Sequence, residues 1–472
     1  MTGITFKNAR VVRSSWLEEG GRRLDCNPYM TGALEARDAL RRLAVPKVPL
    51  RSVTAGHAGG IYNGPKFARI WVTDPDFGVP FLSNSEMLNA DLSTAPYLKK
   101  DYAESKYLAH LRLQDRTTLI TCSGTIGRMC YVRPDMVGMW SSQHIMKVVP
   151  DSKRIPPGYL YAFLSSTYGV PLVVSGTYGA IIQHIEPEHI ADLPVPRIGE
   201  LEEEAVAKLV DGAAEDRANA VQLLREAESL MYALLNVERP TPTHRFARPD
   251  VSTVLCSRLI DRADAYYYGA RNTEARSSFD AASENMALGS VAEVFIPGIF
   301  KRLYASDSAF GSPYITGADV FELSPTSEKY LMRRVAAEYG LLLKKGMLVV
   351  QEAGQLGGLI GRSVMVGDYL DGFACSNNMI RIVPKDDVDA GYLFVLLNSE
   401  YGVRLLSREA AGSSIPHTDE QRVKRLRVPW PARAVRRQIG QPALRARDLR
   451  DQACLKEQAA RDAVEAFIGG GQ

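Results

Sequence analysis

The sequence contains one group of residues whose types suit methyl transfer to a DNA base. Asn27, Pro28 and Tyr29 stand in the stretch DCNPYM. Amine methylation of DNA uses an Asn/Asp-Pro-Pro-aromatic turn, in which a polar side chain and a carbonyl hold the target amine while the aromatic ring stacks on the flipped base. Here the second proline is missing, and no glycine-rich cofactor loop precedes the turn. We interpret the stretch as a structural turn, with a self-sufficient DNA methyltransferase as the alternative.

A second group has residue types that could bind a metal ion. His184, Glu186, Glu188 and His189 occur together in QHIEPEHI. The equivalent stretch later in the chain keeps only His417 of the two histidines, whereas a metal site needs several ligands together. We therefore predict no metal site. The six cysteines form no CxxC pair, which predicts reduced buried thiols, and no nucleotide-binding or nuclease motif is visible, so we expect no catalytic residues.

The elements that would position these side chains belong to a unit that occurs twice in the chain. Aligned without a gap, residues 158–196 and 391–429 agree at roughly 15 of about 39 positions, which indicates two copies of one unit. The agreeing pairs include Gly158 and Gly391, Tyr159 and Tyr392, Tyr168 and Tyr401, Gly169 and Gly402, His184 and His417, and Pro196 and Pro429. Upstream, SGTIGR parallels GGLIGR, and SQHIMKVVP parallels SNNMIRIVP.

Each copy has the pattern of a mixed domain followed by a long helix. Short runs rich in β-branched and aromatic residues predict strands, among them TTLITCS and HIMKVVP in the first copy and GMLVVQE and NMIRIVP in the second. GYLYAFLSS and GYLFVLLNS predict short buried helices. The predicted fold class is α/β (α+β): two similar globular domains, joined by long antiparallel coiled-coil-like helices, in a pseudo-twofold repeat. The predicted ranges are 1–198 and 239–432 for the domains, and 199–238 and 433–472 for the helices.

A heptad pattern predicts how the long helices pack. In the first helix, apolar or small residues alternate at spacings of four and three, and only Arg217 is out of pattern. The apolar side of the second helix is less regular, and Pro442 should kink that helix or start it afresh. The residues expected to pack between helices are Val206, Val210, Ala213, Leu224, Met231, Leu234, Leu449 and Leu455.

Length and composition set the broad class. A chain of 472 residues, with 46% hydrophobic and 24% charged residues, suits a globular protein of several domains. No signal peptide is visible and no apolar run approaches about 18 residues, which predicts a cytoplasmic location. The net charge of +3 neither requires nor excludes nucleic acid, because a basic face can coexist with a balanced total.

The motifs occur in the same order in both copies. SGTIGR, GTYGAIIQHI and LPVP are answered by GGLIGR, AAGSSIPHT and LRVP, and each series leads into a long helix. This arrangement resembles the specificity (S) subunit of Type I restriction-modification enzymes over nearly the whole chain.

The resemblance implies two target-recognition domains, each reading one half of a bipartite, asymmetric sequence in double-stranded DNA. It also implies docking of two methyltransferase (M) subunits and possibly a motor-nuclease (R) subunit. The cofactor S-adenosylmethionine would belong to the methyltransferase, and none to this chain. Alternatives are a recognition subunit of another phage-defence methylation system and a helical adaptor that binds only protein.

Candidate DNA contacts follow from the chemistry of base edges and phosphates. Arg suits guanine, Asn or Gln adenine, Ser or Thr either, and Lys or Arg the phosphates. Candidates in the first copy are Asn63, Lys66, Arg69, Ser123, Thr125, Arg128, Ser141, Gln143 and His144. Those in the second copy are Lys301, Arg302, Tyr304, Gln355, Arg362, Ser376, Asn377 and Asn378.

These assignments have structural alternatives. The glycines of SGTIGR and GGLIGR suit a tight turn as well as a phosphate site. Gln143 and Asn377 also suit buried amides that satisfy strand ends. A basic run is either a solvated face or a phosphate contact, with Arg425 and Arg427 as the DNA-contact candidates; its members are Arg422, Lys424, Arg425, Arg427, Arg433, Arg436 and Arg437.

Overall fold

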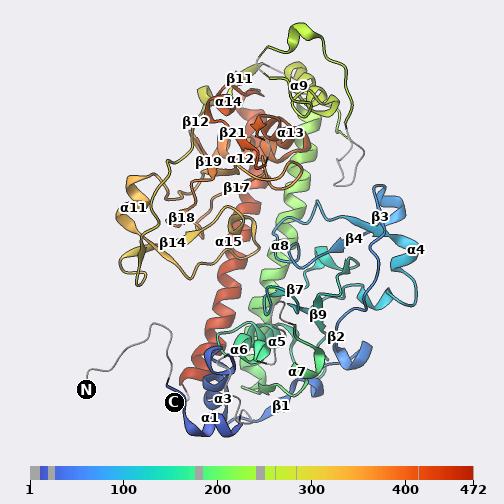
Figure 1. The fold of residues 1–472 in the computed structure, drawn as a ribbon, viewed down its shortest axis with the longest axis vertical. Helices are drawn as coiled ribbons and strands as arrows, with labels where there is room; N and C mark the ends of the chain where they lie inside the picture. Colours follow the sequence, from blue (N-terminus) through green and yellow to red (C-terminus); the bar gives the residue numbers. More distant parts are fainter. Residues whose placement is uncertain are drawn as a thin grey trace. The chain divides into compact units, whose positions relative to one another are not determined.

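The chain folds into two compact units. A computed structural model describes residues 11–19, 27–175, 184–240, 250–260, 262–282, 284–412 and 414–470. Unit 1 comprises Met1–Leu88, Tyr97–Glu215 and Leu455–Gln472, and unit 2 comprises Asn89–Pro96 and Asp216–Cys454. Two long helices, α8 (Glu200–Leu234) and α15 (Arg433–Gly470), each contribute one part to unit 1 and the other part to unit 2 (Figure 1).

Unit 1 contains two four-stranded sheets and a two-stranded ribbon. The first sheet has the order β2-β9-β6-β7 and is antiparallel. The second has the order β3-β5-β4-β8, with β4 and β8 parallel, and β1 pairs with β10. The strands are β1 (Lys47–Pro49), β2 (Ile61–Tyr62), β3 (Trp71–Val72), β4 (Gly78–Leu82), β5 (Tyr97–Lys99), β6 (Thr118–Thr121), β7 (Met129–Tyr131), β8 (Trp140–Ser141), β9 (Ile145–Val148) and β10 (Pro194–Pro196).

Unit 2 repeats these sheets strand for strand. Its orders are β12-β19-β16-β17 and β13-β15-β14-β18, with β14 and β18 parallel, and β11 pairs with β22. One further ribbon joins β20 to β21. The strands are β11 (Asn285–Ala287), β12 (Ala292–Phe295), β13 (Tyr304–Ala305), β14 (Gly311–Ile315), β15 (Tyr330–Met332), β16 (Leu348–Gln351), β17 (Ser363–Met365), β18 (Ala374–Cys375), β19 (Met379–Pro384), β20 (Ala410–Ala411), β21 (His417–Thr418) and β22 (Arg427–Pro429).

The repeat extends to the register of single residues. Lys147 of β9 lies opposite Leu119 of β6, and Arg381 of β19 lies opposite Val349 of β16. Lys147 and Arg381 are therefore equivalent, as are the loops that precede them. The predicted fold class, two similar α+β domains with an internal repeat, is confirmed at the level of strand register.

Helices complete each unit. In unit 1 they are α1 (Ser14–Glu19), α2 (Asn27–Met30), α3 (Ala33–Arg42), α4 (Lys100–Ala103), α5 (Pro157–Leu164), α6 (Gly169–Val174) and α7 (Pro187–Ala191). In unit 2 they are α9 (Ala270–Ala282), α10 (Leu288–Val291), α11 (Arg333–Glu338), α12 (Asp387–Asn398), α13 (Glu400–Arg408) and α14 (Glu420–Arg425). Every residue of α5 is buried, as is most of α12, so the two short buried helices predicted from the sequence are present.

The repeated glycine and tyrosine of α5 and α12 have the same role in both units. A Cβ atom on Gly158 would lie 2.7 Å from the Ala207 carbonyl oxygen of α8, and one on Gly391 would lie 2.6 Å from the Gly440 carbonyl oxygen of α15. The hydroxyl groups of Tyr159 and Tyr392 donate to the carbonyls of Pro196 and Pro429, at 2.5 and 2.7 Å. The repeated block thus docks each domain against a long helix.

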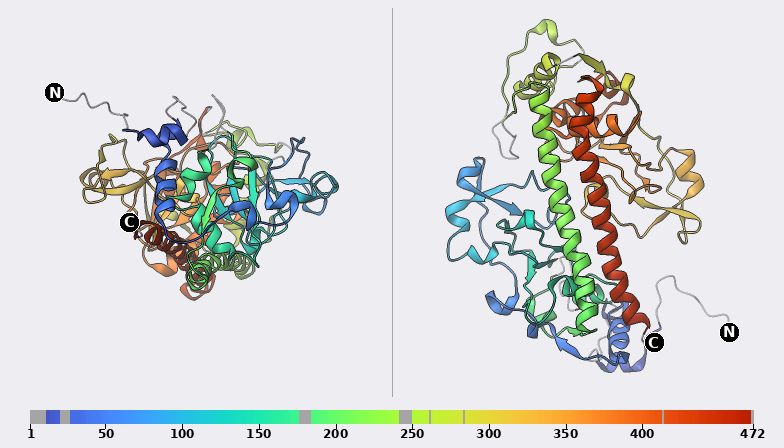
Figure 2. Two further views of the ribbon diagram at one scale, coloured as in Figure 1. Left: turned by 90° about the horizontal axis from the view of Figure 1, so that it is seen from below. Right: turned by 180° about the vertical axis from the view of Figure 1, so that it is seen from behind.

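Within each unit, α8 and α15 pack side by side. In unit 1, Val206 and Val210 of α8 share a core with Ala460 and Val464 of α15. In unit 2, the core instead joins later residues of α8 to earlier residues of α15, namely Ala227 and Met231 to Ile439 and Ala443. The two helices are therefore antiparallel (Figure 2).

The seam of α15 differs from the predicted one. Seven of its buried residues lie on this seam, spaced by four and three except for a step of seven from Ala446 to Ala453, and four of them are alanines: Ile439, Ala443, Ala446, Ala453, Glu457, Ala460 and Val464. Leu455 and Leu234 are 56% and 39% exposed, so they lie outside the seam, and Leu449 is half-buried. Val206, Val210, Ala213 and Met231 are buried, and Leu224 packs partly buried against the core of unit 2.

Pro442 was predicted to kink the second long helix or to start it afresh, and the structure answers the second of these possibilities. Helix α15 runs without a break from Arg433 to Gly470, so the proline does not start the helix afresh. Pro442 lacks an N–H group, so it cannot donate to the carbonyl four residues earlier, at Gln438. Gln438 is exposed, and water can satisfy its carbonyl.

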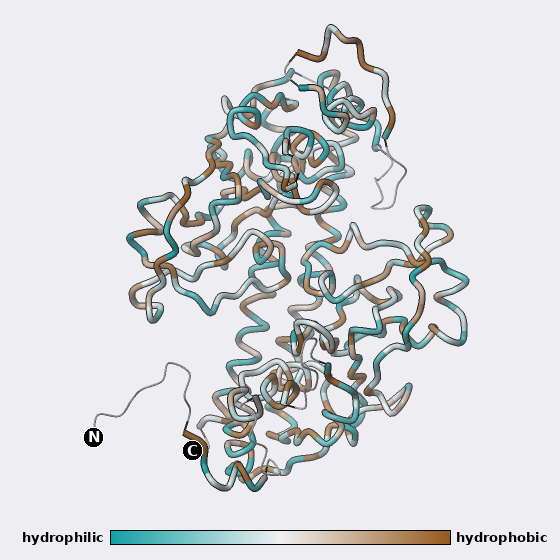
Figure 3. The backbone as a smooth tube through the Cα atoms, in the orientation of Figure 1, coloured by the Kyte–Doolittle hydropathy of each residue, from teal (hydrophilic) through white to brown (hydrophobic). Residues whose placement is uncertain are grey.

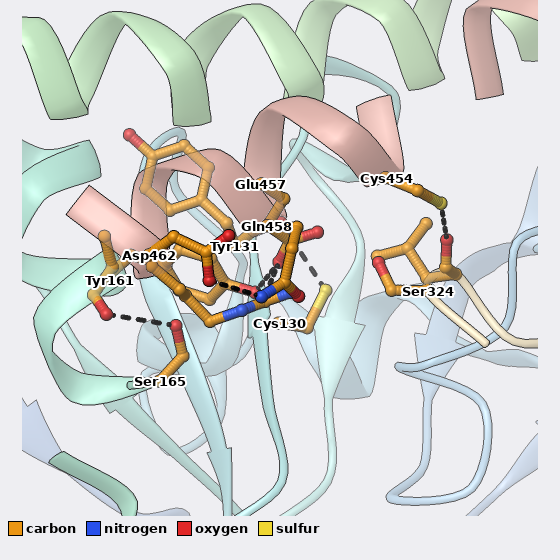
Figure 4. A network of polar contacts seen from close by, with 12 residues as sticks. Cys130, Tyr131, Tyr161, Ser165, Ser324, Cys454, Glu457, Gln458 and Asp462 are labelled. Atoms are coloured by element: carbon orange, nitrogen blue, oxygen red, sulfur yellow. Dashed lines mark hydrogen bonds and ion pairs between the residues drawn. The ribbon is translucent and has the colours of Figure 1, made fainter. Parts of the chain in front are cut away.

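A buried carboxylate anchors the C-terminal part of α15 in unit 1. The hydroxyl of Tyr161, from α5, donates to Oε1 of Glu457, and Arg461 lies 3.3 Å from the same oxygen (Figure 4). Glu457 is 2% exposed. A carboxylate buried this deeply is tolerated because both partners compensate its lost hydration.

No helix in the described ranges is long and apolar enough to cross a membrane. Apolar residues instead alternate with polar ones along the chain (Figure 3).

Candidate nucleic-acid interface

The loop between β8 and β9 brings two predicted contact residues to one place in unit 1. This loop consists of Ser142, Gln143 and His144, between two buried strands. Gln143 and His144 are half-buried, and their Nε2 atoms lie 3.1 Å apart. The buried strands fix both ends of the loop, so the two side chains project from a rigid frame.

Asn63 lies close to the same loop. Its neighbour Gly64 is so near Gln143 that a Cβ atom would lie 3.0 Å from the Gln143 Cα atom. The Asn63 Nδ2 group donates to Glu186 at 3.0 Å. Among the described residues, neither Asn63 Oδ1 nor Gln143 Oε1 has a hydrogen-bond partner, although both atoms are buried. Leaving such acceptors unpaired costs free energy, so the two amides are the polar groups of this region that still need a partner.

Positive charge surrounds His144. Burial lowers the pKa of His144, and the charges of Arg69, His184 and Lys66 lower it further. Lys66 and Arg69 are exposed, and the Arg69 guanidinium lies 5.6 Å from the ring centre of Phe81 in β4. Lys66 and Arg69 therefore lie near the Gln143-His144 loop, and together they could hold phosphates beside base edges.

The SGTIGR turn connects β6 to β7 in unit 1. Gly124 and Gly127 have φ values of 78° and 80°, which favour glycine, so both serve the backbone of the turn. Thr125 and Arg128 are exposed, while the Ser123 carbonyl accepts from Asn84 at 2.9 Å. The two glycines thus shape the turn, and the exposed side chains of Thr125 and Arg128 remain accessible to a ligand.

Ser141 is one of the predicted DNA contacts, but its side chain is not accessible. It is fully buried in β8, and its hydroxyl donates to the Leu111 carbonyl at 3.3 Å. Its side chain therefore serves the fold, and its neighbour Trp140 in the same strand is buried as well.

Unit 2 presents an equivalent loop with different side chains. Ser376, Asn377 and Asn378 connect β18 to β19; Ser376 is buried, Asn377 is half-buried and Asn378 is exposed. The Ser376 Oγ atom accepts from the Asn378 amide at 3.3 Å, and Ser142 Oγ accepts from the His144 amide at 3.1 Å. The two loops therefore have the same backbone hydrogen bond, but they present different side chains, Gln143-His144 in unit 1 and Asn377-Asn378 in unit 2.

An arginine lies against the equivalent aromatic residue of β4 in unit 1 and of β14 in unit 2. Arg302 Nε lies 3.4 Å from the Tyr314 hydroxyl of β14, as Arg69 lies over Phe81 of β4. Lys301 is exposed, and Tyr304 is 44% exposed. Lys301 and Arg302 are therefore accessible.

The turn between β16 and β17 distinguishes unit 2 from unit 1. It runs from Ala353 to Arg362, ten residues against six in Ser123–Arg128. Gln355 is exposed in the added part, and Arg362 is half-buried with Asp91 at 3.6 Å. A longer turn at this position gives the two units different surfaces.

Much of the predicted basic run is neutralised by acidic partners. Ion pairs join Arg422 to Glu409, Lys424 to Glu420, Arg433 to Asp386, and Arg436 to Asp389. Four members of the run therefore have structural partners, and their ion pairs hold the domain to α15 and to itself. Arg425, Arg427 and Arg437 are exposed, and Arg427 donates to the Asn285 carbonyl at 2.8 Å.

The histidines and acids of QHIEPEHI have structural partners. Glu186 and His189 form a capping box at the start of α7. In unit 2, His417 Nδ1 lies 2.9 Å from Glu352 Oε1. The described residues contain no group of three or more His, Cys, Asp or Glu placed to hold a metal ion.

Tyr29 of the NPY stretch is buried. It is 6% exposed and packs with Trp16 and Leu34 beside α3. Its ring is thus occupied by core contacts and cannot stack on a base in this conformation.

Two buried cations, Lys147 and Arg381, were not among the predicted site residues. Each stands behind the loop that presents the polar residues, and they are 2% and 0% exposed. The sequence carries a signal for them, since a basic residue interrupts an otherwise apolar strand at the same position of HIMKVVP and NMIRIVP.

The fold and these sites define a two-copy α+β protein with paired antiparallel helices and a polar, cationic loop region in each copy. No protein-family model matches the chain, and no curated protein sequence matches it.

Several solved structures are similar to the chain, among them the following three. An S subunit of a Type I restriction-modification system from M. genitalium aligns with 90% of this chain and 97% of its own, at 13% identity and a TM-score of 0.37. The HsdS subunit from Thermoanaerobacter tengcongensis aligns over the same fractions, at 13% identity and a TM-score of 0.27. A chain from a study of complex assembly in the type I R-M system aligns with 91% of this chain and all of its own, at 12% identity and a TM-score of 0.28.

The chain thus resembles Type I specificity subunits over most of its length, as the order of its motifs predicts.

Proposed function

We propose that the chain is the sequence-recognition subunit of a Type I-like DNA adenine methyltransferase or restriction complex. It performs no chemistry and directs partner subunits to a bipartite, asymmetric site in double-stranded DNA. One observation carries the proposal: two register-matched domains present equivalent loops with different polar residues, Gln143-His144 and Asn377-Asn378. Amide side chains suit adenine, and the neighbouring Arg and Lys suit phosphates or guanine.

The two loops explain why the target should be asymmetric. If both domains used the same side chains, they would read the same half-site twice. They differ at both loop positions and in the length of the β6–β7 and β16–β17 turns. Each domain therefore selects its own half-site.

Methyl transfer belongs to the partners under this proposal. Two methyltransferase subunits would bind S-adenosylmethionine and methylate adenine, and a motor-nuclease subunit could join them. In this division of work, the chain supplies binding and orientation, which need no catalytic side chain.

The test is a map of modified bases. The chain is co-expressed with a methyltransferase subunit encoded beside it, and adenine methylation of plasmid DNA is mapped by long-read sequencing. The expected result is a motif of two different short blocks with a fixed gap. A continuous motif, or methylation independent of this chain, contradicts the proposal. Purified chain alone, incubated with labelled methyl donor and DNA, should incorporate no label.

A further inference from the structure

In each unit, a buried cation binds the loop that presents the polar residues. Lys147 Nζ donates to the carbonyls of Ser142 and Ile145, at 3.3 and 2.8 Å. In unit 2, Arg381 Nη2 donates to the carbonyls of Cys375 and Ser376, both at 3.0 Å. Its Nη1 donates to the Met379 carbonyl at 2.7 Å. Both cations thus bind the carbonyls at the two ends of a short loop.

The loop backbone is fixed from its other side as well. The His144 carbonyl accepts from the Cys122 amide at 3.0 Å, and the Asn378 carbonyl accepts from the Glu352 amide at 3.3 Å. Each loop serine accepts from the amide two residues later, as described above. These bonds hold the backbone of both loops in the same way, which leaves their side chains as the variable part.

A cation is a costly residue to bury on an apolar strand. Removing an ammonium or guanidinium group from water is unfavourable unless its hydrogen bonds are replaced. Burial accordingly lowers the pKa of Lys147 to about 7. An apolar residue would fit the strand pattern, but it could not bind several converging carbonyls. Both copies nevertheless keep a cation at this position.

We propose that Lys147 and Arg381 are positioning residues for base readout. Each fixes the backbone of a two-residue reading pair, Gln143-His144 or Asn377-Asn378, and the identity of that pair selects bases in one half-site. This inference rests on the proposed function and deepens it, because it assigns readout to two positions per domain and separates them from the frame that holds them.

The first experiment removes the cation from one unit at a time. Complexes with the methyltransferase partner carry Lys147→Met, Arg381→Met, or the conservative Lys147→Arg, which copies unit 2. Lys147→Met should relax one half-site, so that methylation at sites mismatched in that half rises about tenfold relative to matched sites. The other half-site should keep its sequence. Arg381→Met should produce the mirror result, and Lys147→Arg should retain the wild-type motif.

Different outcomes separate this inference from the proposed function. A wild-type complex without a bipartite motif refutes the proposed function itself. A bipartite wild-type motif that stays unchanged in both Met variants, with methylation lowered equally at all sites, shows a merely structural role and overturns the inference.

A second variant decides the matter if the Met variants do not fold. Gln143→Asn combined with His144→Asn leaves Lys147 and Ser142 in place and gives unit 1 the reading pair of unit 2. The expected result is a changed base preference in one half-site with normal protein yield. An unchanged motif in this double variant overturns the inference.

Discussion

Lys147 and Arg381 show how a single buried charge can serve a binding surface that it does not touch. Both side chains are enclosed and donate to loop carbonyls, so neither is available to a ligand. The exposed cations Lys66 and Arg69 have the opposite character, since their charged ends face solvent. At the residue scale, buried cations set geometry and exposed cations attract phosphate.

The buried lysine predicts a pH dependence of stability. Burial lowers the pKa of Lys147 to about 7, below the ordinary lysine value of roughly 10.4. Between these values the unfolded chain binds more protons than the folded chain, so the free energy of unfolding rises with pH across that window. The slope from this one group is at most roughly 1.4 kcal/mol per pH unit. Urea denaturation from pH 7 to 9 should show this rise in wild type and a smaller rise in Lys147→Met.

The exposed cations predict a change in salt dependence. Removing both charges in Lys66→Ala, Arg69→Ala should weaken DNA binding by the complex for all sequences alike. The slope of log K against log salt should fall by roughly 0.9 for each phosphate that the protein no longer neutralises. Titration of fluorescent duplexes at several salt concentrations measures the slope. Lys345→Ala, which removes an exposed lysine paired with Asp368, is the matched control; an equal decrease there would refute the phosphate role.

At the element scale, glycines determine how closely the short helices approach the long ones. Gly158 and Gly391 allow backbone contact with α8 and α15 at the same repeat position. The helix pair itself is also built for close approach, because alanines fill most of the α15 seam. Small residues therefore join each domain to the helices.

Adding a methyl group at these glycines should disturb that close packing. Gly158→Ala and Gly391→Ala place Cβ against backbone atoms that cannot move aside, and overpacking of this kind costs about 1–3 kcal/mol. Gly298→Ala is the control, because its Cβ would meet nothing within 4 Å. Thermal or urea unfolding of the three variants tests this. Equal stability of all three would show that the helices can relax apart.

Replacing the proline inside α15 should stabilise the helix. Pro442→Ala restores an N–H donor for the Gln438 carbonyl and removes a ring from the helix interior, where proline costs about 3 kcal/mol relative to alanine. We expect a gain of about 1–3 kcal/mol in urea denaturation. Gln441→Ala, at the exposed neighbouring position, should change stability little. A loss of stability in Pro442→Ala would mean that the native helix needs the proline geometry.

At the scale of the whole molecule, the repeat joins two similar domains through helices that belong to both. Neither long helix lies within one unit, since α8 and α15 pass from one to the other. Their seams share the same spacing, and corresponding seam positions, such as Val206 and Ile439, occupy the same places in the two copies. The number of heptads in both helices must therefore match.

Deleting heptads tests this match, and it also tests a spacing role, in which the length of the helix pair sets the gap between the two half-sites. Removing residues 214–220 from α8 alone should disrupt the seam and destabilise the protein strongly. Removing residues 447–453 from α15 as well should restore packing. Seven helical residues span about 10 Å, so the gap in the methylated motif should shorten by about three base pairs. Long-read methylation maps measure the gap; an unchanged gap in a folded double deletion refutes the spacing role.

The sequence alone predicted the repeat, the strands, the short buried helices and the heptad helix, because periodic apolar patterns report which faces are buried. It also predicted several members of each loop region, since Gln143, His144, Asn377 and Asn378 precede clear strands. The α15 seam escaped this reasoning because alanine gives a weak hydrophobic signal.

Which polar side chains are buried, paired or exposed was decided only by the tertiary structure. Ser141 is buried beside a carbonyl from a distant segment, three arginines of the basic run pair with Glu and Asp from other elements, and Lys147 and Arg381 are enclosed. Whether a polar group faces solvent depends on partners far away in the chain, and no local pattern records those partners. The sequence therefore determined the frame of this protein, and the folded chain decided which charges remain free to meet another molecule.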